Sequence, residues 1–442
     1  MWQFIRQFLG LTPSESAQRA LSIAFWRSTA GVFIALRIAD LLNAVTGLYI
    51  IPLNLPSNAI GAVLPLMQVG AVLAMPVSVF TLVFTRHLCA YAVAGNSVRT
   101  RGLLRDALTA TALTLCGALL LAALLMPWIC HLLRIEHTAA GYLAVGYGLL
   151  AAFTPMAWSA LQALKRFGAI SAGALIGAPI RLVVMAFLLP IFGLSGYFIG
   201  QSLPPIIMLI VASIALFPLL KQSRDAPFMA WRNDLKPMLR YAGWITLGVL
   251  AAGLQGAIIT FVIRNRLTDD VSGAYYLISR FAEIATYSGT TLATVLFPFA
   301  IEARLRGLTS HQFHIGVTAF ILLLGFSLAA LLYGLLPFIF TYIPGLSPYL
   351  GYEGAAAYLT LITTLNAAST LHFTHAAAHD RFTYLIFLLP LTLLLSGALL
   401  FFSAPSLVQI LHLLFGHALL QFIGSLITAR YDFKHAQKCL LS

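Results

Sequence analysis

Three arginines lie near the middle of apolar segments that are each long enough to cross a lipid bilayer: Arg37, Arg181 and Arg280. A guanidinium at the bilayer centre costs from roughly 2.5 to more than 10 kcal/mol, so such residues normally face a bundle interior or a wet cavity. Guanidinium groups bind phosphates and carboxylates through paired hydrogen bonds. The three arginines therefore predict an anion-binding site inside a membrane.

Two of these arginines have a carboxylate one helical turn away. Asp40 follows Arg37 by three residues, and Glu283 follows Arg280 by the same spacing. Residues i and i+3 share one face of a helix, so each pair can form an ion pair. Two interpretations stay open. The pairs lock helices together, or an anionic substrate competes for the arginine and the freed carboxylate takes up a proton as a coupling acid.

Arg181 differs from the other two because no acidic residue lies within one helical turn of it. It follows Pro179 by two residues, in a stretch rich in glycine and alanine. Unless another helix supplies a carboxylate, Arg181 is the best candidate for a phosphate contact. A structural salt bridge is the alternative.

The composition places these residues in a membrane protein. Of 442 residues, 60% are hydrophobic and 9% are charged, and the mean hydropathy is +0.92. Soluble domains carry about 25% charged residues. The net charge of +13 would suggest nucleic acid in a soluble protein, but here it reflects membrane topology, and we expect no nucleic-acid partner. Residues 1–21 lack a signal-peptide pattern and predict an amphipathic helix on the membrane surface.

Apolar runs of about 20 residues predict an all-α polytopic membrane protein with about twelve transmembrane helices. The expected spans are 25–50, 60–84, 106–128, 139–162, 169–191, 195–218, 239–262, 271–298, 314–340, 355–378, 382–402 and 405–428. A long basic connection with two prolines divides them into two six-helix lobes around a central cavity. The predicted segments are the amphipathic N-terminus 1–21, a first lobe 22–218, a cytoplasmic linker 219–238, a second lobe 239–430 and a cytoplasmic tail 431–442.

The basic residues are distributed unevenly over the two sides of this topology. With the N-terminus inside, 20 of the 26 lysines and arginines fall on the inner side, three on the outer side and three within the spans. The asymmetry follows the positive-inside rule and predicts that both termini are cytoplasmic. At the outer end of the seventh span, Arg264 and Arg266 precede Asp269 and Asp270, and there we expect a solvated rim.

No strong enzymatic motif occurs in the chain. It lacks G-x-x-x-x-G-K-[ST], G-x-S-x-G and H-E-x-x-H, and its outer loops are short. We therefore expect no enzyme, no catalytic residues and no cofactor. His372, His375 and His379 share one helical face, which suits a metal site or a pH sensor, but a polar seam is the favoured interpretation and no metal site is predicted.

Several segments resemble the MOP exporter superfamily, and within it the flippases for O-antigen and exopolysaccharide. The segment 239–298 has the pattern of that branch: a seventh span, a short outer turn, a Gly-x-Tyr start at Gly273 and a Leu-Phe-Pro end at Pro298. The segments 95–105 and 160–167, which follow the second and fourth spans, are similar in kind. The resemblance covers nearly the whole chain.

The resemblance implies that the two lobes move a polyprenyl-pyrophosphate-linked oligosaccharide from the inner to the outer leaflet of a bacterial inner membrane by alternating access. It assigns the pyrophosphate to Arg37, Arg181 and Arg280. Candidate polar contacts to the sugar are Asn43, Gln68, Gln201 and Gln255. The expected partners are this substrate, membrane lipids, a proton or sodium ion that drives transport, and other proteins of polysaccharide assembly.

A MATE-type cation-coupled multidrug exporter is the main alternative. Asp40, an acid within the first span, is similar to the cation-binding acid of that branch. The deep residues comprise three arginines against Asp40 and Glu283, a net charge of +1 that favours an anion. Two further alternatives are a membrane enzyme and a scaffold subunit of polysaccharide assembly. The enzyme would need an active site built from outer segments, and in the scaffold the central arginines would be dispensable.

Overall fold

The computed structural model describes residues 16–132, 138–222, 226–306, 311–343, 346–401 and 406–441. Within these ranges every long element is an α-helix and no strand occurs. The helices are α2 (Ser16–Val45), α3 (Ile51–Asn54), α4 (Ser57–Leu73), α5 (Met75–Val93), α6 (Ser97–Leu132), α7 (Thr138–Ala163), α8 (Phe167–Gln222), α9 (Leu235–Arg266), α10 (Asp269–Leu305), α11 (His311–Tyr342), α12 (Glu353–Ala378), α13 (Leu385–Phe401) and α14 (Leu407–Leu441). The predicted all-α class is confirmed.

These helices account for the twelve predicted crossings. A π-helical stretch, Thr46–Ile50, joins α2 to α3 in the first crossing, and α4 and α5 follow each other around Ala74 in the second. Nine helices in the described ranges are long and apolar enough to span a membrane, and the 56-residue α8 among them holds two crossings. The predicted amphipathic segment lies largely outside the described residues, which begin at residue 16.

The two crossings of α8 fold back on each other at Gly193, which has φ 53° and ψ −129°. This left-handed conformation favours glycine because it has no Cβ. The two arms then pack through small residues: a Cβ added to Gly177 would lie 3.3 Å from the Cα of Pro204, and one added to Gly200 would meet Met185. The tight hairpin holds Arg181 on the first arm beside the second arm.

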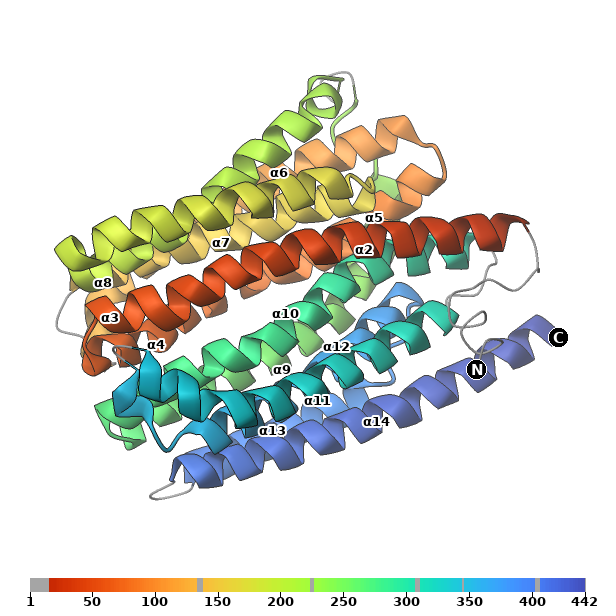
Figure 1. Cartoon of the computed structure of the whole chain (residues 1–442). Coiled ribbons are helices and arrows are strands. Elements are labelled where there is room, and N and C mark those ends of the chain that lie inside the picture. The colour runs from red at the N-terminus through yellow and green to blue at the C-terminus, as the bar shows by residue number, and fades with distance from the viewer. Residues whose placement is uncertain are drawn as a thin grey trace.

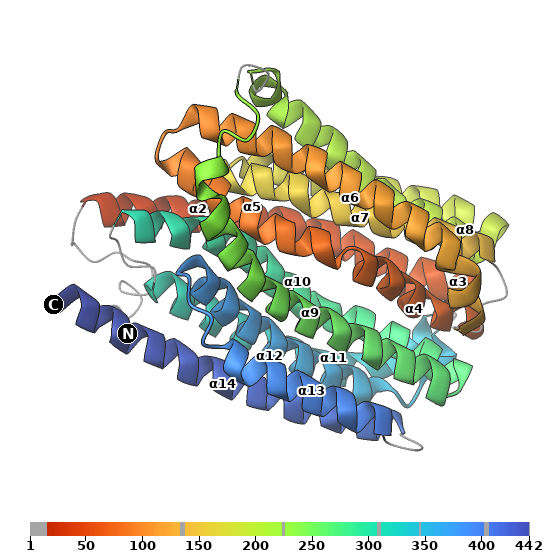
Figure 2. The same cartoon turned by 180° about the vertical axis from the view of Figure 1, so that it is seen from behind.

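The helices form two lobes, α2–α8 and α9–α14 (Figure 1). In both views α2 and α10 run along the junction between the lobes, and Figure 2 shows α9 beside α4 and α5. The beginning of α2 and the end of α14 lie at the same end of the bundle, which we call the basic end (Figure 1). The predicted tail continues α14 as a helix to Leu441.

The connection between the lobes docks on α6. Asp106, on that helix, accepts hydrogen bonds from the Met229 backbone N–H and the Trp231 indole N–H, each at 3.0 Å. Arg105 donates to the carbonyl of Ala226 at 2.9 Å. The helices end at Gln222 and begin again at Leu235, so the observed connection is shorter than the predicted linker 219–238. It is also tied to the first lobe.

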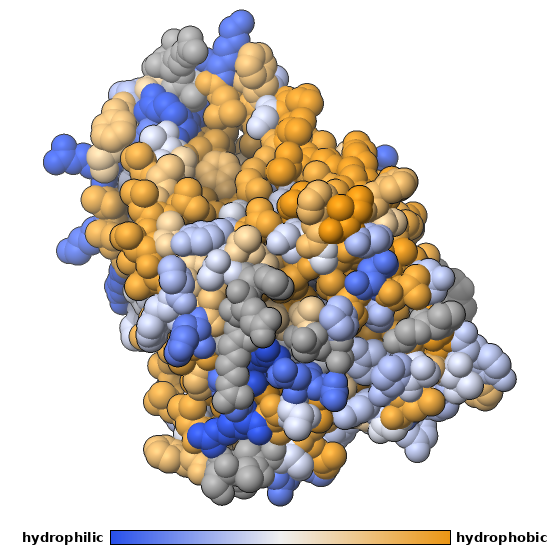
Figure 3. All heavy atoms as spheres, turned by 90° about the vertical axis from the view of Figure 1, so that its left-hand side faces the viewer, coloured by the Kyte–Doolittle hydropathy of each residue, from blue (hydrophilic) through white to orange (hydrophobic). Residues whose placement is uncertain are grey.

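The surface carries many large apolar side chains, as expected of a protein that faces lipid. Leu124, Phe187, Leu323 and Leu393 are each at least 70% exposed. Soluble monomeric proteins rarely expose an apolar surface of this extent, so it indicates contact with lipid. Seen end-on in Figure 3, hydrophilic clusters lie among broad hydrophobic areas. The chain is therefore a polytopic membrane protein built from two helical lobes.

Helices α4 and α7 cross at two glycines, and this contact makes a testable prediction. A Cβ added to Gly148 would lie 2.6 Å from the Cα of Gly70. Because backbone atoms cannot yield as a side chain can, we expect Gly148→Ala to lower the free energy of unfolding by about 1–3 kcal/mol. Thermal unfolding of the detergent-purified protein measures this. Gly146→Ala is the matched control, since no atom lies within 4 Å of that Cβ, and equal unfolding temperatures for the two variants would contradict the prediction.

Candidate functional site

A cavity of about 780 Å³ lies between the lobes, and all three predicted arginines line it. Its walls come from α2, α7 and α8 of the first lobe and from α10 of the second. Asp40 and Glu283 line the same cavity. Residues separated by up to 246 positions in the chain are thereby brought together, as an anion site built from both lobes requires.

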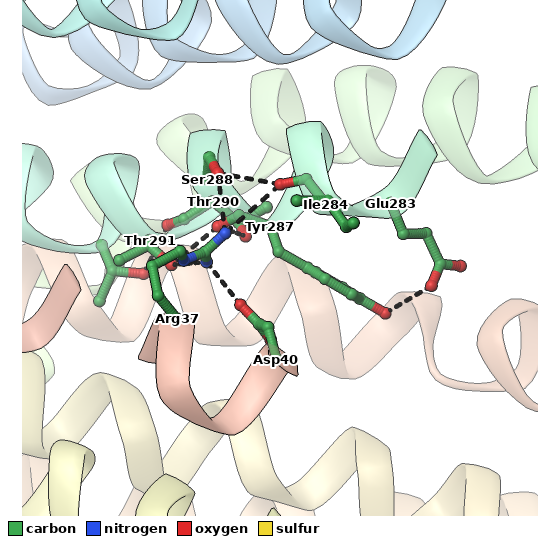
Figure 4. Close-up of polar contacts among 9 residues, drawn as sticks. Arg37, Asp40, Glu283, Ile284, Tyr287, Ser288, Thr290 and Thr291 are labelled. Atoms are coloured by element: carbon green, nitrogen blue, oxygen red, sulfur yellow. Dashed lines mark hydrogen bonds and ion pairs between the residues drawn. The ribbon is translucent and has the colours of Figure 1, made fainter. Parts of the chain in front are cut away.

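Arg37 links the two lobes directly (Figure 4). From α2 it forms an ion pair with Asp40 at 2.7 Å and donates to the hydroxyls of Ser288 and Thr291 on α10, at 2.7 and 3.1 Å. It also contacts the carbonyl oxygen of Ile284 at 3.3 Å. Asp40 neutralises its charge, and its two terminal nitrogens make hydrogen bonds within the protein, whereas its Nε has no partner. Arg37 is therefore a structural link as well as a cavity residue.

Arg280 and Glu283 form the second predicted ion pair, on α10. The Arg280 guanidinium also lies over the ring of Tyr276, 4.8 Å from its centroid. Tyr287 donates its hydroxyl proton to Glu283 at 2.8 Å, as Figure 4 shows. Glu283 thus has two partners, and the pair is neutral overall.

Arg181 is the cavity arginine that forms no ion pair within the described chain. Its guanidinium donates to the amide oxygen of Asn43 at 2.6 Å, and no carboxylate of the described chain lies within 4 Å of it. Arg181 is only 8% exposed, and its Nε, like those of Arg37 and Arg280, has no hydrogen-bond partner. A buried cation with a neutral partner and an unsatisfied donor is suited to accept an anion.

The charges that line the cavity sum to +1, from three arginines and two carboxylates. Each carboxylate is paired with its own arginine, so the excess charge resides on Arg181. Low-dielectric walls around a cavity strengthen the field of such a charge. The electrostatics of the cavity favour an anion over a cation.

Of the four predicted neutral contacts, two line the cavity and two do not. Asn43 and Gln201 line it. Gln68 instead approaches the carbonyl of Gly253 at 3.5 Å, between α4 and α9, and Gln255 lies 3.5 Å from Nδ1 of His417. Those two glutamines sit on helix faces that pack against other helices. The structure therefore does not bring Gln68 or Gln255 to the site that we predicted for them.

Several cavity residues did not enter the sequence prediction. On α10, Tyr287, Thr290 and Thr294 follow Glu283 at intervals of four, three and four residues, which places them on one helical face. On α7, Trp158 and Gln162 line the opposite wall at the same kind of interval. The helical spacing from Glu283 was the signal that would have found the first group.

At the basic end the lobes are joined by charged side chains. Lys165, after α7, forms an ion pair with Glu302 on α10. Asp380, after α12, pairs with Arg86 of the first lobe at 2.5 Å and with Arg304 of the second at 2.7 Å. Glu302 is only 4% exposed. The pairs of Lys165 with Glu302 and of Arg86 with Asp380 thus join the two lobes at the basic end.

At the opposite end the lobes meet through closely packed small residues. The Ser272 hydroxyl approaches the carbonyl of Gly61 at 3.4 Å, and a Cβ added to Gly61 would lie 3.3 Å from Arg264. Arg264 pairs with Asp269 at 2.8 Å and is 5% exposed. The prediction of a solvated rim was wrong for Arg264, because α4 of the other lobe covers it.

The predicted histidine seam forms inside the second lobe. His314 of α11 stacks against His375 of α12, with ring centroids 4.5 Å apart, and His372 meets His314 edge-on at 4.4 Å. His379 contacts His375 at 4.7 Å. Within the part of the chain that the structure describes, no group of three or more histidine, cysteine or acidic residues has a geometry that would hold a metal ion.

Comparison with known proteins identifies the fold. No known sequence family and no curated protein matches the chain. Among solved structures, a variant of the Vibrio cholerae MATE transporter VcmN superposes with TM-score 0.72 and 14% identity, over 96% of this chain and 99% of that one. An outward-facing multidrug resistance MATE family transporter of the MOP superfamily gives 0.67 and 12%, over 98% of both chains. An inward-facing one gives 0.64 and 13%, over 92% and 96%. The predicted architecture of two lobes is confirmed.

Proposed function

We propose that this chain is a secondary transporter that carries an anionic amphiphile across the bilayer by alternating access of its two lobes. The anion is, in this proposal, a polyprenyl-pyrophosphate-linked oligosaccharide moved from the inner to the outer leaflet. The observation that carries the proposal is Arg181, a buried cavity cation with no carboxylate partner among the described residues. A diphosphate offers the several acceptor oxygens that such a group binds best.

The contacts between the lobes support alternating access. At the basic end the lobes are joined by polar side chains, namely Lys165 with Glu302 and Arg86 with Asp380. A partly exposed ion pair such as Arg86 with Asp380 contributes little net stability, so breaking it when a lobe rotates costs little. The likeness to transporter structures described as inward-facing and outward-facing agrees with such a motion.

The location belongs to the same proposal. The basic end collects most lysines and arginines, which the positive-inside rule assigns to the cytoplasm. We place both termini in the cytoplasm and the chain in a bacterial inner membrane. A proton or sodium ion is the proposed coupling ion, with Asp40 and Glu283 as candidate acids, and other polysaccharide-assembly proteins are the proposed partners.

A cation-coupled multidrug exporter is the second candidate. The solved structures that resemble this chain are MATE transporters, two of them described as multidrug resistance proteins. Asp40 lies in the cavity on the first crossing, where it can accept a cation once Arg37 releases it. The overall fold favours this candidate, whereas the charge of the cavity favours the anion.

One assay separates the two. The purified chain is placed in proteoliposomes with a fluorescent polyprenyl-diphosphate hexose, and a membrane-impermeant quencher reports how fast the headgroup changes leaflet. We expect movement faster than in protein-free liposomes. In parallel, ethidium-type organic cations are offered against a proton or sodium gradient. Export of cations without movement of the diphosphate lipid would replace our proposal with the multidrug exporter.

A further inference from the structure

The cavity is divided along its length into a charged part and an uncharged part. Helix α10 runs from the opposite end toward the basic end, so Arg280 and Glu283 precede Thr290 and Thr294 along the cavity wall. Arg280 and Thr290 are ten residues apart, which corresponds to about 15 Å along the helix. Arg37 contacts α10 from Ile284 to Thr291, so its guanidinium borders the uncharged part near Thr290.

We call the uncharged part the neutral tier, defined by Thr154, Trp158, Ser159, Gln162, Thr290 and Thr294. These residues come from α7 and α10, that is, from both lobes. These six residues are uncharged, and Arg37 borders them through its hydrogen bond to Thr291. The tier is polar and neutral, a combination that suits a ligand with hydroxyl groups and no charge.

The threonine hydroxyls of the neutral tier are oriented as acceptors. Thr294 donates its proton to the carbonyl of Thr290 at 2.8 Å, Thr290 to that of Tyr287 at 3.1 Å, and Thr154 to that of Leu150 at 2.8 Å. Each hydroxyl has one proton and two lone pairs, so a hydroxyl that donates to its own helix still accepts. The tier therefore offers several acceptor oxygens to a ligand that brings O–H donors.

The α7 wall adds a flat aromatic surface and an unused donor. Trp158 lines the cavity, and its indole N–H is buried without a hydrogen-bond partner. A ligand oxygen that reaches this N–H would satisfy the unused donor. Gln162 is held in place by a hydrogen bond to the carbonyl of Thr294 at 2.5 Å, which braces the two walls against each other.

We infer that the neutral tier is a binding subsite for an uncharged sugar ring, held beside the charged part that takes the diphosphate. A carbohydrate supplies the many O–H donors that the threonine oxygens accept, acceptor oxygens for the indole N–H, and an apolar ring face for the indole ring. This inference deepens the proposed function and rests on it for the identity of the whole substrate.

Binding measurements on the full chain in lipid nanodiscs test the inference. The probes are polyprenyl diphosphates that carry no sugar, one hexose or three hexoses. We expect the hexose probes to bind the native chain at least about tenfold more tightly than the bare diphosphate. The variant Thr290→Val/Thr294→Val keeps side-chain shape but removes two acceptors, so it loses about three- to tenfold per hydrogen bond for the hexose probes only. Thr114→Val is the matched control, because Thr114 also bonds to its own helix but is exposed on α6.

The outcomes separate this inference from the proposed function. Equal affinity of the native chain for bare and glycosylated probes, or an unchanged sugar preference in the double valine variant, overturns the subsite and leaves diphosphate transport standing. If no diphosphate probe binds, the proposed function fails. The subsite is then decided by an alkyl glucoside against an alkyl ethylene glycol ether of the same chain length. A preference for the glucoside that the double variant loses supports it, and equal binding overturns it.

Discussion

Replacing Arg181 by alanine is expected to reduce transport of a polyprenyl-diphosphate sugar by about 100-fold or more, since charge-assisted hydrogen bonds contribute about 1.5–3 kcal/mol each and a guanidinium makes two. The folded protein should change little. The side chain gives the protein one hydrogen bond, to Asn43, and carries an uncompensated buried charge. Headgroup movement in proteoliposomes and thermal unfolding in detergent measure the two effects separately.

Two further variants make this result specific. Arg181→Lys keeps the charge but loses the paired donors, so we expect intermediate transport. Arg240→Ala removes an arginine from the exposed surface of α9, away from the cavity, and should transport as the native chain does. Normal transport by Arg181→Ala would remove Arg181 from the anion site. A matching loss in Arg240→Ala would show that net charge alone matters.

The outline of the fold could be predicted from the sequence, because the length and hydropathy of apolar segments identify membrane helices. The hairpin at Gly193 was expected between two apolar runs, and a left-handed glycine forms it. The pairs of Arg37 with Asp40 and of Arg280 with Glu283 followed from helical spacing alone. Local geometry fixes such contacts, so they do not depend on how the helices are arranged.

Features that depend on the arrangement of helices were not readable. Which face of α4 or α9 meets another helix decides that Gln68 and Gln255 lie away from the cavity. The burial of Arg264 depends on its contact with Gly61 of α4, which lies 203 residues earlier in the sequence. Arg37 is a further example. Its partner Asp40 was predicted, but its bonds to Ser288 and Thr291 were not, because no local sequence pattern shows how the two lobes pack together.

Those bonds lead to the second large effect, in variants of Arg37. Arg37→Met removes an ion pair and the inter-lobe hydrogen bonds together, and it leaves Asp40 as an uncompensated, largely buried carboxylate. Breaking one partner of a fully buried pair costs about 3–5 kcal/mol. Since about a fifth of each side chain is exposed here, we expect a loss of about 1–3 kcal/mol in the free energy of unfolding, together with reduced transport.

The double variant Arg37→Met/Asp40→Asn shows which part of this loss is electrostatic. In the double variant no unpaired carboxylate remains, so we expect it to recover at least half of the stability that Arg37→Met loses. Transport should stay reduced, because the link from Arg37 to α10 is still broken. Asp40→Asn alone leaves three bonds from Arg37 to α10 and should keep measurable movement of the diphosphate lipid. The multidrug exporter requires the reverse order, with Asp40→Asn the most damaging change for cation export. Ranking the three variants in both transport assays therefore tests whether Asp40 serves Arg37 or a transported cation. A double variant that is as unstable as Arg37→Met would show that the hydrogen bonds between the lobes, rather than the charge, hold this junction together.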